Sequence, residues 1–280
     1  MEHSSGKGEH RNIERVTAVM DALSKASARG LRLTDVVEAT GLGKTTAHRL
    51  LGGLVDNGLA EQDEESGRFF VGLKMLAWAS AAKNRFSFAR LAEPLLERVS
   101  RRTQDTIYLV MRSGDEIVCL DGREGSFPIR VLTLNIGDRR PLGIGAGSLA
   151  ILAALPDDEV ERILTTQGEA RAHFPYTEMK LRELVAKTRR EGFAYNNLHL
   201  FEGMESATDM AAIGVPIRRR DGTPVAALHL TAIPSRLEPP RRDELVSSLK
   251  KEAADLETEI EPVLESIAGR SRTGAIGGIA

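Results

Sequence analysis

Residues 33–55, LTDVVEATGLGKTTAHRLLGGLV, decide how the first part of this chain folds. Gly41 separates a short helical pattern, carried by Val36, Val37 and Ala39, from a second one that begins near Lys44. The second pattern has an apolar stripe at helical spacing, made of Ala47, Leu50, Leu51 and Leu54. Its opposite side is made of Thr45, His48, Arg49 and Gly52. The segment therefore predicts two helices joined by a glycine turn.

The outer face of the second helix suits double-stranded DNA. No Asp or Glu occurs between Ala39 and Val55, so a phosphate backbone would meet no like charge there. As the second helix of a helix-turn-helix, it would lie in the major groove and hydrogen-bond phosphates and base edges. The residues expected to contact DNA are Lys44, Thr45, Thr46, His48 and Arg49. The alternative, from periodicity alone, is an amphipathic helix whose polar face is only solvated.

A hairpin completes the predicted winged helix-turn-helix. Residues 59–61 and 69–71 are strand-like and flank a charged turn, so they predict a wing whose Arg68 would contact the DNA backbone. Gly52 and Gly53, inside the second helix, should each cost about 1 kcal/mol relative to alanine. A close backbone approach or a bend is therefore expected at this glycine pair.

Length and composition indicate a globular protein of two domains. The chain has 280 residues, of which 41% are hydrophobic and 28% are charged. Its formal net charge of −2 excludes a polyelectrolyte binder. A local basic face is still allowed, because exposed charges act over a Debye length of about 10 Å. The single cysteine, Cys119, excludes an internal disulfide and a cysteine-based zinc site, and fits a reducing compartment.

Neither a membrane segment nor a secretion signal is predicted. No apolar run approaches the roughly 20 residues that span a bilayer, and residues 1–10 lack the apolar core of a signal peptide. We therefore expect a cytoplasmic protein without a membrane partner. Residues 1–10 are interpreted as a disordered arm and residues 269–280 as a flexible tail.

The rest of the chain mixes strands and helices. Residues 74–90 predict a helical connector, and the helix after it is expected to have Pro94 in its first turn. Strands are expected over 106–111, 116–121, 129–136, 193–195, 212–218 and 225–231. Helices are expected over 148–155, 157–164, 177–191 and 241–267. This pattern predicts an antiparallel sheet covered by helices, and hence an α+β protein.

Polar residues in this second part are candidates for a ligand site. Three glycines in the run 143–147 precede a helix near Ser148, and form either an anion cradle or simply a turn. His229 and Thr231 share one side of a strand, where each needs a ligand or a protein partner. Arg130 would either pair with an anionic ligand or lie at the surface.

The ligand is expected to be a small organic acid, aromatic acids included. An apolar and adaptable wall for it would come from Phe201, Met204 and Met210.

Motifs in order along the chain resemble the isocitrate lyase regulator (IclR) family of bacterial transcription regulators. The first are residues 33–51, Gly58-Leu59, Gly67-Arg68-Phe69 and Val71-Gly72-Leu73. The later ones are Asp121-Gly122-Arg123, residues 137–142 (GDRRPL), 153–156 (AALP), Gly192-Phe193-Ala194, Val215-Pro216-Ile217 and residues 222–228 (GTPVAAL). The resemblance spans about residues 11–268.

The resemblance implies a winged helix-turn-helix domain over 11–73, a linker helix over 74–90 that helps to dimerise, and a GAF-like α/β effector-binding domain over 91–268. Such a repressor or activator binds operator DNA as a homodimer or homotetramer and responds to a small-molecule effector. The family's effector-contacting segments correspond here to Gly145, Ala146, Gly147, Ser148, Asn196, Met204, His229 and Thr231. This chain departs from the family pattern in its glycine-rich loop 143–148, and at Ala212, near which a cysteine is frequent. The effector's identity therefore does not carry over.

Two other classes of function are the alternatives: a small-molecule hydrolase using Cys119 or Ser148, and an interaction module without a ligand. Cys119 lies between apolar residues of a predicted strand and is expected to be packed and inert. The sequence contains no nucleophile elbow, no HExxH motif and no evident carboxylate pair. We therefore expect a regulator that is not an enzyme, with no catalytic residue, no cofactor and no metal.

Overall fold

The computed structural model describes residues 5–26, 29–85, 87–172, 174, 176–197 and 210–273. The chain divides into two compact units, residues 1–85 and 86–280, each of which is described by itself. In neither described part is any helix long and apolar enough to cross a bilayer.

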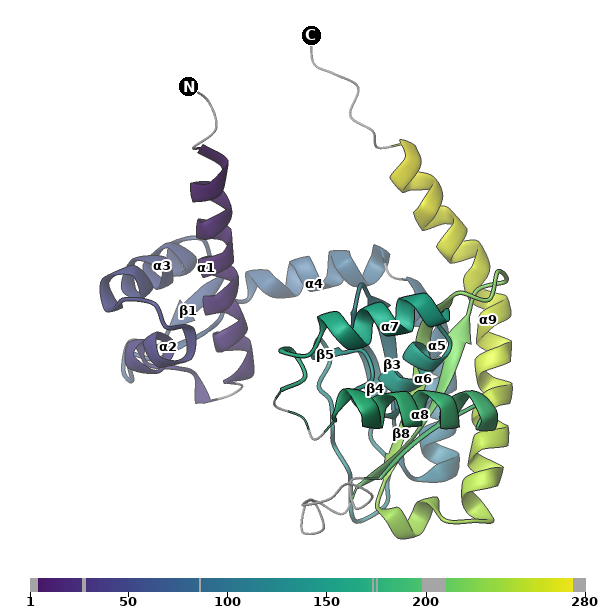
Figure 1. The fold of residues 1–280 in the computed structure, drawn as a ribbon. Helices are drawn as coiled ribbons and strands as arrows, with labels where there is room; N and C mark the ends of the chain where they lie inside the picture. Colours follow the sequence, from purple (N-terminus) through teal and green to yellow (C-terminus); the bar gives the residue numbers. More distant parts are fainter. Residues whose placement is uncertain are drawn as a thin grey trace. The chain divides into compact units, whose positions relative to one another are not determined.

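The first unit is a winged helix-turn-helix (Figure 1). Its helices are α1 (Ser5–Lys25), α2 (Leu33–Thr40), α3 (Lys44–Asp56) and α4 (Lys74–Arg85). Between α3 and α4, β1 (Ala60–Gln62) and β2 (Phe69–Val71) pair antiparallel as the wing. The core of this unit includes Val19 from α1, Val36 from α2 and Leu51 from α3. The two helices of the predicted helix-turn-helix and the predicted hairpin of this unit are confirmed.

The second unit is built on a six-stranded antiparallel sheet, in the order β5-β4-β3-β8-β7-β6. The strands are β3 (Thr106–Ser113), β4 (Glu116–Arg123), β5 (Arg139–Pro141), β6 (Ala194–Asn197), β7 (Ala211–Arg218) and β8 (Pro224–Ala232). The helices are α5 (Ser87–Thr103), α6 (Ala146–Ala153), α7 (Asp157–Thr166), α8 (Glu178–Glu191) and α9 (Arg241–Thr273), with a short 3₁₀ turn, η3 (Pro234–Leu237), before α9.

The sheet buries both of its faces (Figure 1). On β3, Tyr108 and Val110 belong to the core shared with α6, α7 and α8, whereas Ile107 and Leu109 belong to the core shared with α5 and α9. This alternation follows from the period of two along a strand. Helices therefore cover both faces, and the predicted α+β class is confirmed.

Both ends of the chain are more helical than predicted. Helix α1 begins at Ser5, within the arm expected over residues 1–10, and α9 extends to Thr273, within the tail expected over 269–280. Once the packed part of a helix has formed, each further residue adds a hydrogen bond without a new nucleus, so the helix extends into polar sequence. Residues 1–4 and 274–280 lie outside the described residues.

The single connector helix predicted over residues 74–90 is wrong. Helix α4 ends at Arg85 and α5 begins at Ser87, so Pro94 lies inside α5 rather than in the first turn of a helix. Apolar residues on both sides of the proline, Phe88, Ala92, Leu95 and Val99, pack into the core and draw the helix past it. Pro94 itself is exposed, so the carbonyl that loses its helical partner lies on the solvent side.

The strand predicted over residues 129–136 is also wrong. The edge strand beside β4 is β5, at Arg139–Pro141, and residues 129–136 instead run as an irregular segment that we call the strap. The strap is held by side chains of the sheet instead of a strand ladder: the Thr231 hydroxyl donates to the Val131 carbonyl at 2.7 Å. The apolar residues of the strap produced a strand-like pattern in the sequence, although the strap does not pair with a strand.

Candidate functional sites

Helix α3 presents its polar face to solvent. Ala47, Leu51 and Leu54 are buried against α1 and α2, which fixes the rotation of the helix. Gly41 ends α2 with a left-handed φ of +66°, and its N–H donates to the Val37 carbonyl at 2.9 Å. This glycine turn sets α3 against α2, as the sequence predicted.

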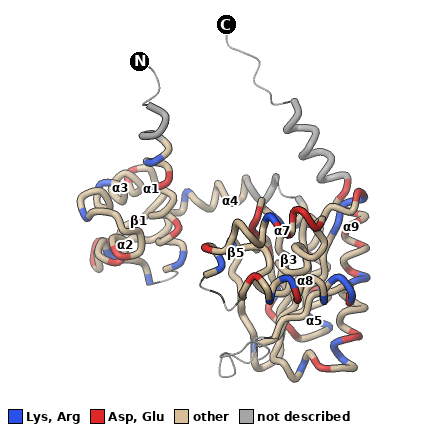
Figure 2. The backbone as a smooth tube through the Cα atoms, viewed as in Figure 1, with Lys and Arg blue, Asp and Glu red and all other residues tan. Residues whose placement is uncertain are grey.

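Most of the predicted DNA contacts lie together on this face. Lys44, Thr45, His48 and Arg49 are exposed, and Thr46 is half-buried. Neither Lys44 nor Arg49 forms a salt bridge within the described part of the chain. The helix has no acidic residue before Asp56, and Figure 2 shows the Lys and Arg segments along it. Two unneutralised cations and several hydroxyl and imidazole groups are therefore available to an external polyanion.

The sixth predicted contact, Arg68, is engaged inside the domain. Its guanidinium donates to the Gly30 carbonyl at 3.1 Å and to the Arg29 carbonyl at 3.4 Å. The side chain is half-buried and ties the wing to the loop after α1. These hydrogen bonds position the wing.

The glycine pair in α3 has open surroundings. A Cβ added at Gly52 or Gly53 would have no protein atom within 4 Å. The close backbone approach expected here is therefore not made by this chain itself.

The anion cradle expected in the loop before α6 is filled by side chains. The N–H of Gly143 donates to the Ser148 hydroxyl at 2.9 Å, and that of Gly147 donates to His229 Nδ1 at 2.8 Å. The backbone of Gly145 hydrogen-bonds the Tyr176 hydroxyl. Three glycines of the loop are thus engaged within the domain, so the interpretation of the run as a turn fits better than the interpretation as a cradle.

Ser148 is engaged as well. It is buried, and its hydroxyl donates to the Pro141 carbonyl at 3.0 Å while accepting from Gly143. A Cβ at Gly147 would lie 2.8 Å from the His229 Cβ, and one at Gly214 would lie 2.0 Å from the Ala146 carbonyl oxygen. Close packing of α6 on β7 and β8 requires glycine at both positions.

Three of the predicted effector residues lie on one face of the sheet. His229 on β8 is opposite Tyr108 on β3, and the next row places Thr231 beside Ala212, which pairs with Asn196 on β6. His229 and Asn196 are 4% and 6% exposed, so each needs partners. The sheet thus gathers His229, Thr231 and Asn196 beneath the strap, as expected.

His229 is a neutral hydrogen-bond donor. Burial and the nearby Arg140 charge lower the pKa of His229 to about 3. Its Nδ1 accepts the Gly147 N–H, so the proton of the neutral ring lies on Nε2. That Nε2 atom is buried and has no hydrogen-bond partner in the part of the chain that the structure describes.

Three further polar residues of this cluster were not predicted: Tyr108, Arg140 and Tyr176. The Tyr108 ring lies 5.9 Å from the His229 ring, centroid to centroid. Burial raises the pKa of Tyr176 to about 12, and its hydroxyl is hydrogen-bonded by Asn196. Burial also lowers the pKa of Arg140, whose guanidinium donates to the Thr133 carbonyl. Strand alternation was the available signal, since Arg139 is exposed and its neighbour Arg140 is turned inward.

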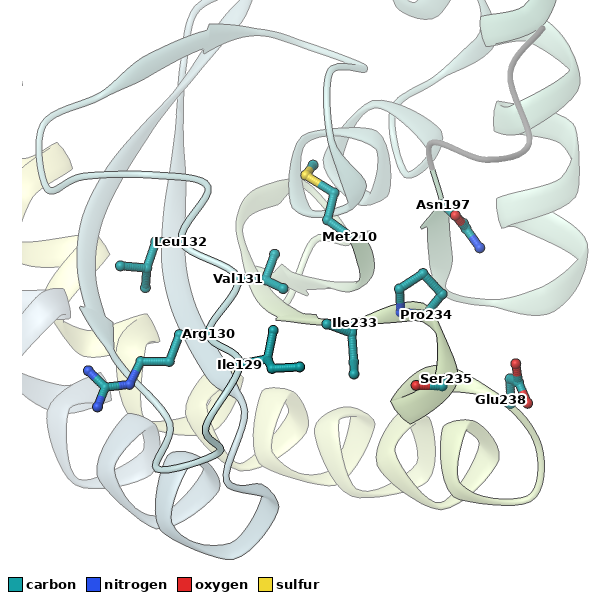
Figure 3. Close-up of a pocket in the computed structure, with 10 residues that line it drawn as sticks. All are labelled: Ile129, Arg130, Val131, Leu132, Asn197, Met210, Ile233, Pro234, Ser235 and Glu238. Atoms are coloured by element: carbon teal, nitrogen blue, oxygen red, sulfur yellow. The ribbon is translucent and has the colours of Figure 1, made fainter. Parts of the chain in front are cut away.

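Arg130 and Met204 do not join this cluster among the described residues. Arg130 forms a 3.0 Å salt bridge with the exposed Glu124, and Figure 3 shows it directed away from the aliphatic residues around it. Met204 lies outside the described residues.

A cavity of about 720 Å³ opens beside the strap, at the ends of β6 and β8 and the start of β7 (Figure 3). Its lining is mainly aliphatic and consists of Ile129, Arg130, Val131, Leu132, Asn197, Met210, Ile233, Pro234, Ser235 and Glu238. A volume of this size is typical of a site for a small organic molecule.

The alternative nucleophile Cys119 is not activated. It is buried, and burial raises the pKa of its thiol to about 12. Across the described residues, no cluster of His, Cys, Asp and Glu has the arrangement of a metal site.

These features define a class of protein: a winged helix-turn-helix, in which the exposed face of α3 carries no acidic residue before Asp56, joined in one chain to a sheet domain that gathers polar groups. Family models match both parts: the IclR helix-turn-helix domain over residues 12–64 and the bacterial transcriptional regulator IclR C-terminal domain over residues 81–258. The chain belongs to the IclR family. It is a DNA-binding transcriptional regulator with a C-terminal effector-binding domain, as the resemblance implied.

Known regulators align with this chain over most of its length and most of their own. The HTH-type transcriptional regulator KipR of Bacillus subtilis is 28% identical over 235 residues, which are 82% of this chain and 90% of KipR. The IclR transcriptional regulator from Alicyclobacillus acidocaldarius superposes with a TM-score of 0.73 at 22% identity, covering 89% of this chain and 98% of that one. An IclR homologue from Microbacterium hydrocarbonoxydans, solved with 4-hydroxybenzoate, gives a TM-score of 0.67 at 22% identity, with coverages of 89% and 98%.

Proposed function

We propose that this regulator reads its operator with α3 and that a small organic acid controls the binding. The residues assigned to DNA are Lys44, Thr45, Thr46, His48 and Arg49. The observation that carries the assignment is the exposed, acid-free face of α3, on which Lys44 and Arg49 have no ion-pair partner among the described residues. Arg68, whose guanidinium also holds the wing to the loop after α1, is assigned to the DNA backbone.

The protein acts as a homodimer that pairs two reading helices. The first unit exposes large apolar side chains on and next to α4: Val71, Leu73, Leu76 and Trp78 are 37%, 70%, 67% and 52% exposed. Such a patch is costly in water, and a second copy of the same surface covers it with two-fold symmetry. Two reading helices related by that symmetry match a palindromic operator. Sedimentation equilibrium, which measures the mass of the assembly, distinguishes this dimer from a tetramer of two dimers.

The effector binds on the sheet face beneath the strap. The residues assigned to it are Asn196, His229 and Thr231, beside the loop of Gly145, Ala146, Gly147 and Ser148, whose polar groups are engaged within the domain. Aromatic acids are the first candidates, because the described cavity is large and mainly aliphatic and a relative of the same fold was solved with 4-hydroxybenzoate. The effector shifts the population between two arrangements of the protein, and only one of them fits the operator.

The protein works in the cytoplasm, where its DNA partner is, and does not turn its effector over. Cys119 is buried and protonated at neutral pH, and the Ser148 hydroxyl is held by Pro141.

The test is operator affinity, measured by fluorescence anisotropy on a DNA site selected from a random library by the wild-type protein. Arg49→Ala removes one exposed cation from the reading face, and we expect a loss of about 10- to 100-fold with a smaller dependence on salt. Lys25→Ala, which removes the exposed cation at the end of α1, is the matched control and keeps nearly full affinity. Unchanged binding of Arg49→Ala would refute the assignment of α3.

A further inference from the structure

Five polar side chains from separate elements meet beneath the strap: Tyr108, Arg140, Tyr176, Asn196 and His229. Four of them are linked directly in two pairs: the Tyr108 ring contacts His229, and Tyr176 is hydrogen-bonded to Asn196. The Arg140 charge acts on His229, Tyr176 and Tyr108 alike. The cluster is therefore one electrostatic unit inside the effector-binding domain.

The strap closes over this cluster through three hydrogen bonds. The Thr231 hydroxyl donates to the Val131 carbonyl at 2.7 Å, the Thr133 N–H donates to the Tyr108 hydroxyl at 3.3 Å, and Arg140 donates to the Thr133 carbonyl. Residues on the same strap, from Ile129 to Leu132, line the 720 Å³ cavity. The strap thus borders the polar cluster and the cavity together.

The cluster is incompletely satisfied by the protein. Among the described residues, His229 Nε2, Asn196 Oδ1 and the Thr133 hydroxyl are buried without a hydrogen-bond partner. Buried polar groups without partners are uncommon, because each forfeits its bond to water. Three of them in one place indicate a site that is completed by another molecule.

Arg140 is a partly buried cation without a carboxylate. Within the described residues it forms no salt bridge, and Asp138, the acid whose charge acts on it, accepts instead from the Asn135 N–H at 2.8 Å. Other partly buried arginines of this domain differ from Arg140 in their partners. Arg236 and Arg241 share the buried Asp105 at 2.7 and 2.6 Å, and Arg171 donates to two carbonyls at the end of α7.

We infer that Arg140 is the anchor for the carboxylate of the effector, and that the body of this acid extends towards the aliphatic cavity beside the strap. This inference rests on the proposed function and adds the recognition residue and the ligand class. A guanidinium binds a carboxylate through two parallel hydrogen bonds, which exceeds what the single Thr133 carbonyl provides. The carboxylate takes the place of that carbonyl on Arg140, and the strap shifts to admit it.

The available groups select an acid over its neutral and cationic analogues. Arg140 and His229 Nε2–H are donors only, so they complement the two acceptor oxygens of a carboxylate. A primary amide would present an N–H₂ group to at least one of these donors, and an ammonium would be repelled by Arg140. The mainly aliphatic lining beside the strap favours an acid with an apolar or aromatic body over a short polar one.

The experiment compares matched acid and amide pairs by isothermal titration calorimetry: benzoate with benzamide, and 4-hydroxybenzoate with 4-hydroxybenzamide. The wild-type protein, Arg140→Gln, Arg140→Lys and Arg139→Gln are titrated in parallel. Arg139 is the control because it is the adjacent residue, exposed and paired with Glu116.

We expect the wild type to prefer an acid over its amide by about tenfold or more. Arg140→Gln should lose about 10- to 100-fold in acid affinity and most of the preference. Arg140→Lys should retain part of it, and Arg139→Gln should match the wild type. Circular dichroism checks the fold of each variant, and Arg140→Lys carries the test if Arg140→Gln does not fold.

Equal binding of acid and amide, no binding of either acid to the wild type, or unchanged acid affinity in Arg140→Gln would each overturn the inference. Operator affinity, measured by fluorescence anisotropy with and without the bound acid, distinguishes a failure of the Arg140 anchor from a failure of the proposed regulatory function. An acid that binds through Arg140 without changing operator affinity would leave the anchor standing and refute the regulatory role.

Discussion

The two domains hold their unpaired positive charge in different ways. On α3, Lys44 and Arg49 are exposed on a helix whose other side is fixed by buried apolar residues. Beneath the strap, Arg140 is enclosed on a sheet face together with buried tyrosines and a neutral histidine. Exposed cations attract a long polyanion through a screened field, whereas an enclosed cation recognises a single group of matching shape. On the proposals made above, this difference separates binding of the DNA by α3 from recognition of one small anion by Arg140.

The largest expected effect comes from destabilising one domain and measuring whether the other domain keeps its binding activity. Leu51 is fully buried in the winged domain, so Leu51→Ala should lower its free energy of unfolding by about 2–5 kcal/mol and abolish operator binding. Leu152→Ala, at a fully buried position of the effector domain, is the mirror variant and should weaken acid binding instead. Thermal unfolding followed by circular dichroism measures both. A common loss of both activities in each variant would contradict two separate folding units.

The second test concerns exposed apolar residues, which occur in both regions. Trp78 in α4 is 52% exposed and Ile129 in the strap is 58% exposed. We expect Trp78→Asp to weaken the dimer by about 30-fold, because tryptophan is a frequent interface hot spot, and Ile129→Asp to leave it intact. Sedimentation equilibrium gives the dissociation constants. A dimer lost in Ile129→Asp and kept in Trp78→Asp would move the interface to the effector domain.

The third test separates the regions by pH. The pKa of His229 is lowered to about 3 in the folded protein against 6.5 for a free histidine, so the unfolded chain binds more protons between these values. The contribution of His229 to the free energy of unfolding is therefore fully present above pH 6.5 and is lost as the pH falls towards 3. From pH 7.5 to pH 5 the effector domain should lose about 2 kcal/mol through this residue.

The measurement is urea unfolding of the effector domain at both pH values. His229→Gln, which retains an acceptor for the Gly147 N–H, should show a smaller loss between them. An equal loss in the variant would show that other groups cause the pH dependence.

Periodicity was enough to predict the reading helix. A helix that packs on one side and meets solvent on the other carries a local signal, and the positions of Leu51 and Arg49 follow from it. Most strands of the effector domain were also predicted, but β5 at Arg139–Pro141 was missed and a strand was expected over residues 129–136 instead. There the apolar residues serve the cavity and the strap, so the pattern indicated a strand that does not form.

The polar cluster could be predicted only in part. His229 and Thr231 were found because strand alternation places both on one face. Arg140, Tyr108 and Tyr176 come from different segments, and only the pairing of β3 with β8 and the path of the strap bring them to His229. Such long-range proximity has no local pattern. The glycine loop was misleading for the same reason, since Ser148, His229 and Tyr176 occupy the N–H groups that looked free for an anion.

The smallest expected effect tests the surface of the reading helix. Gly53 is helical and exposed, and a Cβ there would have open space around it, so Gly53→Ala should raise the free energy of unfolding of the winged domain by about 1 kcal/mol. Gly41 has equally open surroundings but a φ of +66°, so Gly41→Ala should lower stability by about 1 kcal/mol. Urea unfolding measures the opposite signs of this matched pair.

If Gly53→Ala is more stable yet binds the operator more weakly, the DNA backbone approaches the helix there, at the contact that the protein itself does not make. A Gly53→Ala variant less stable than the wild type would instead show that α3 is strained at its glycine pair.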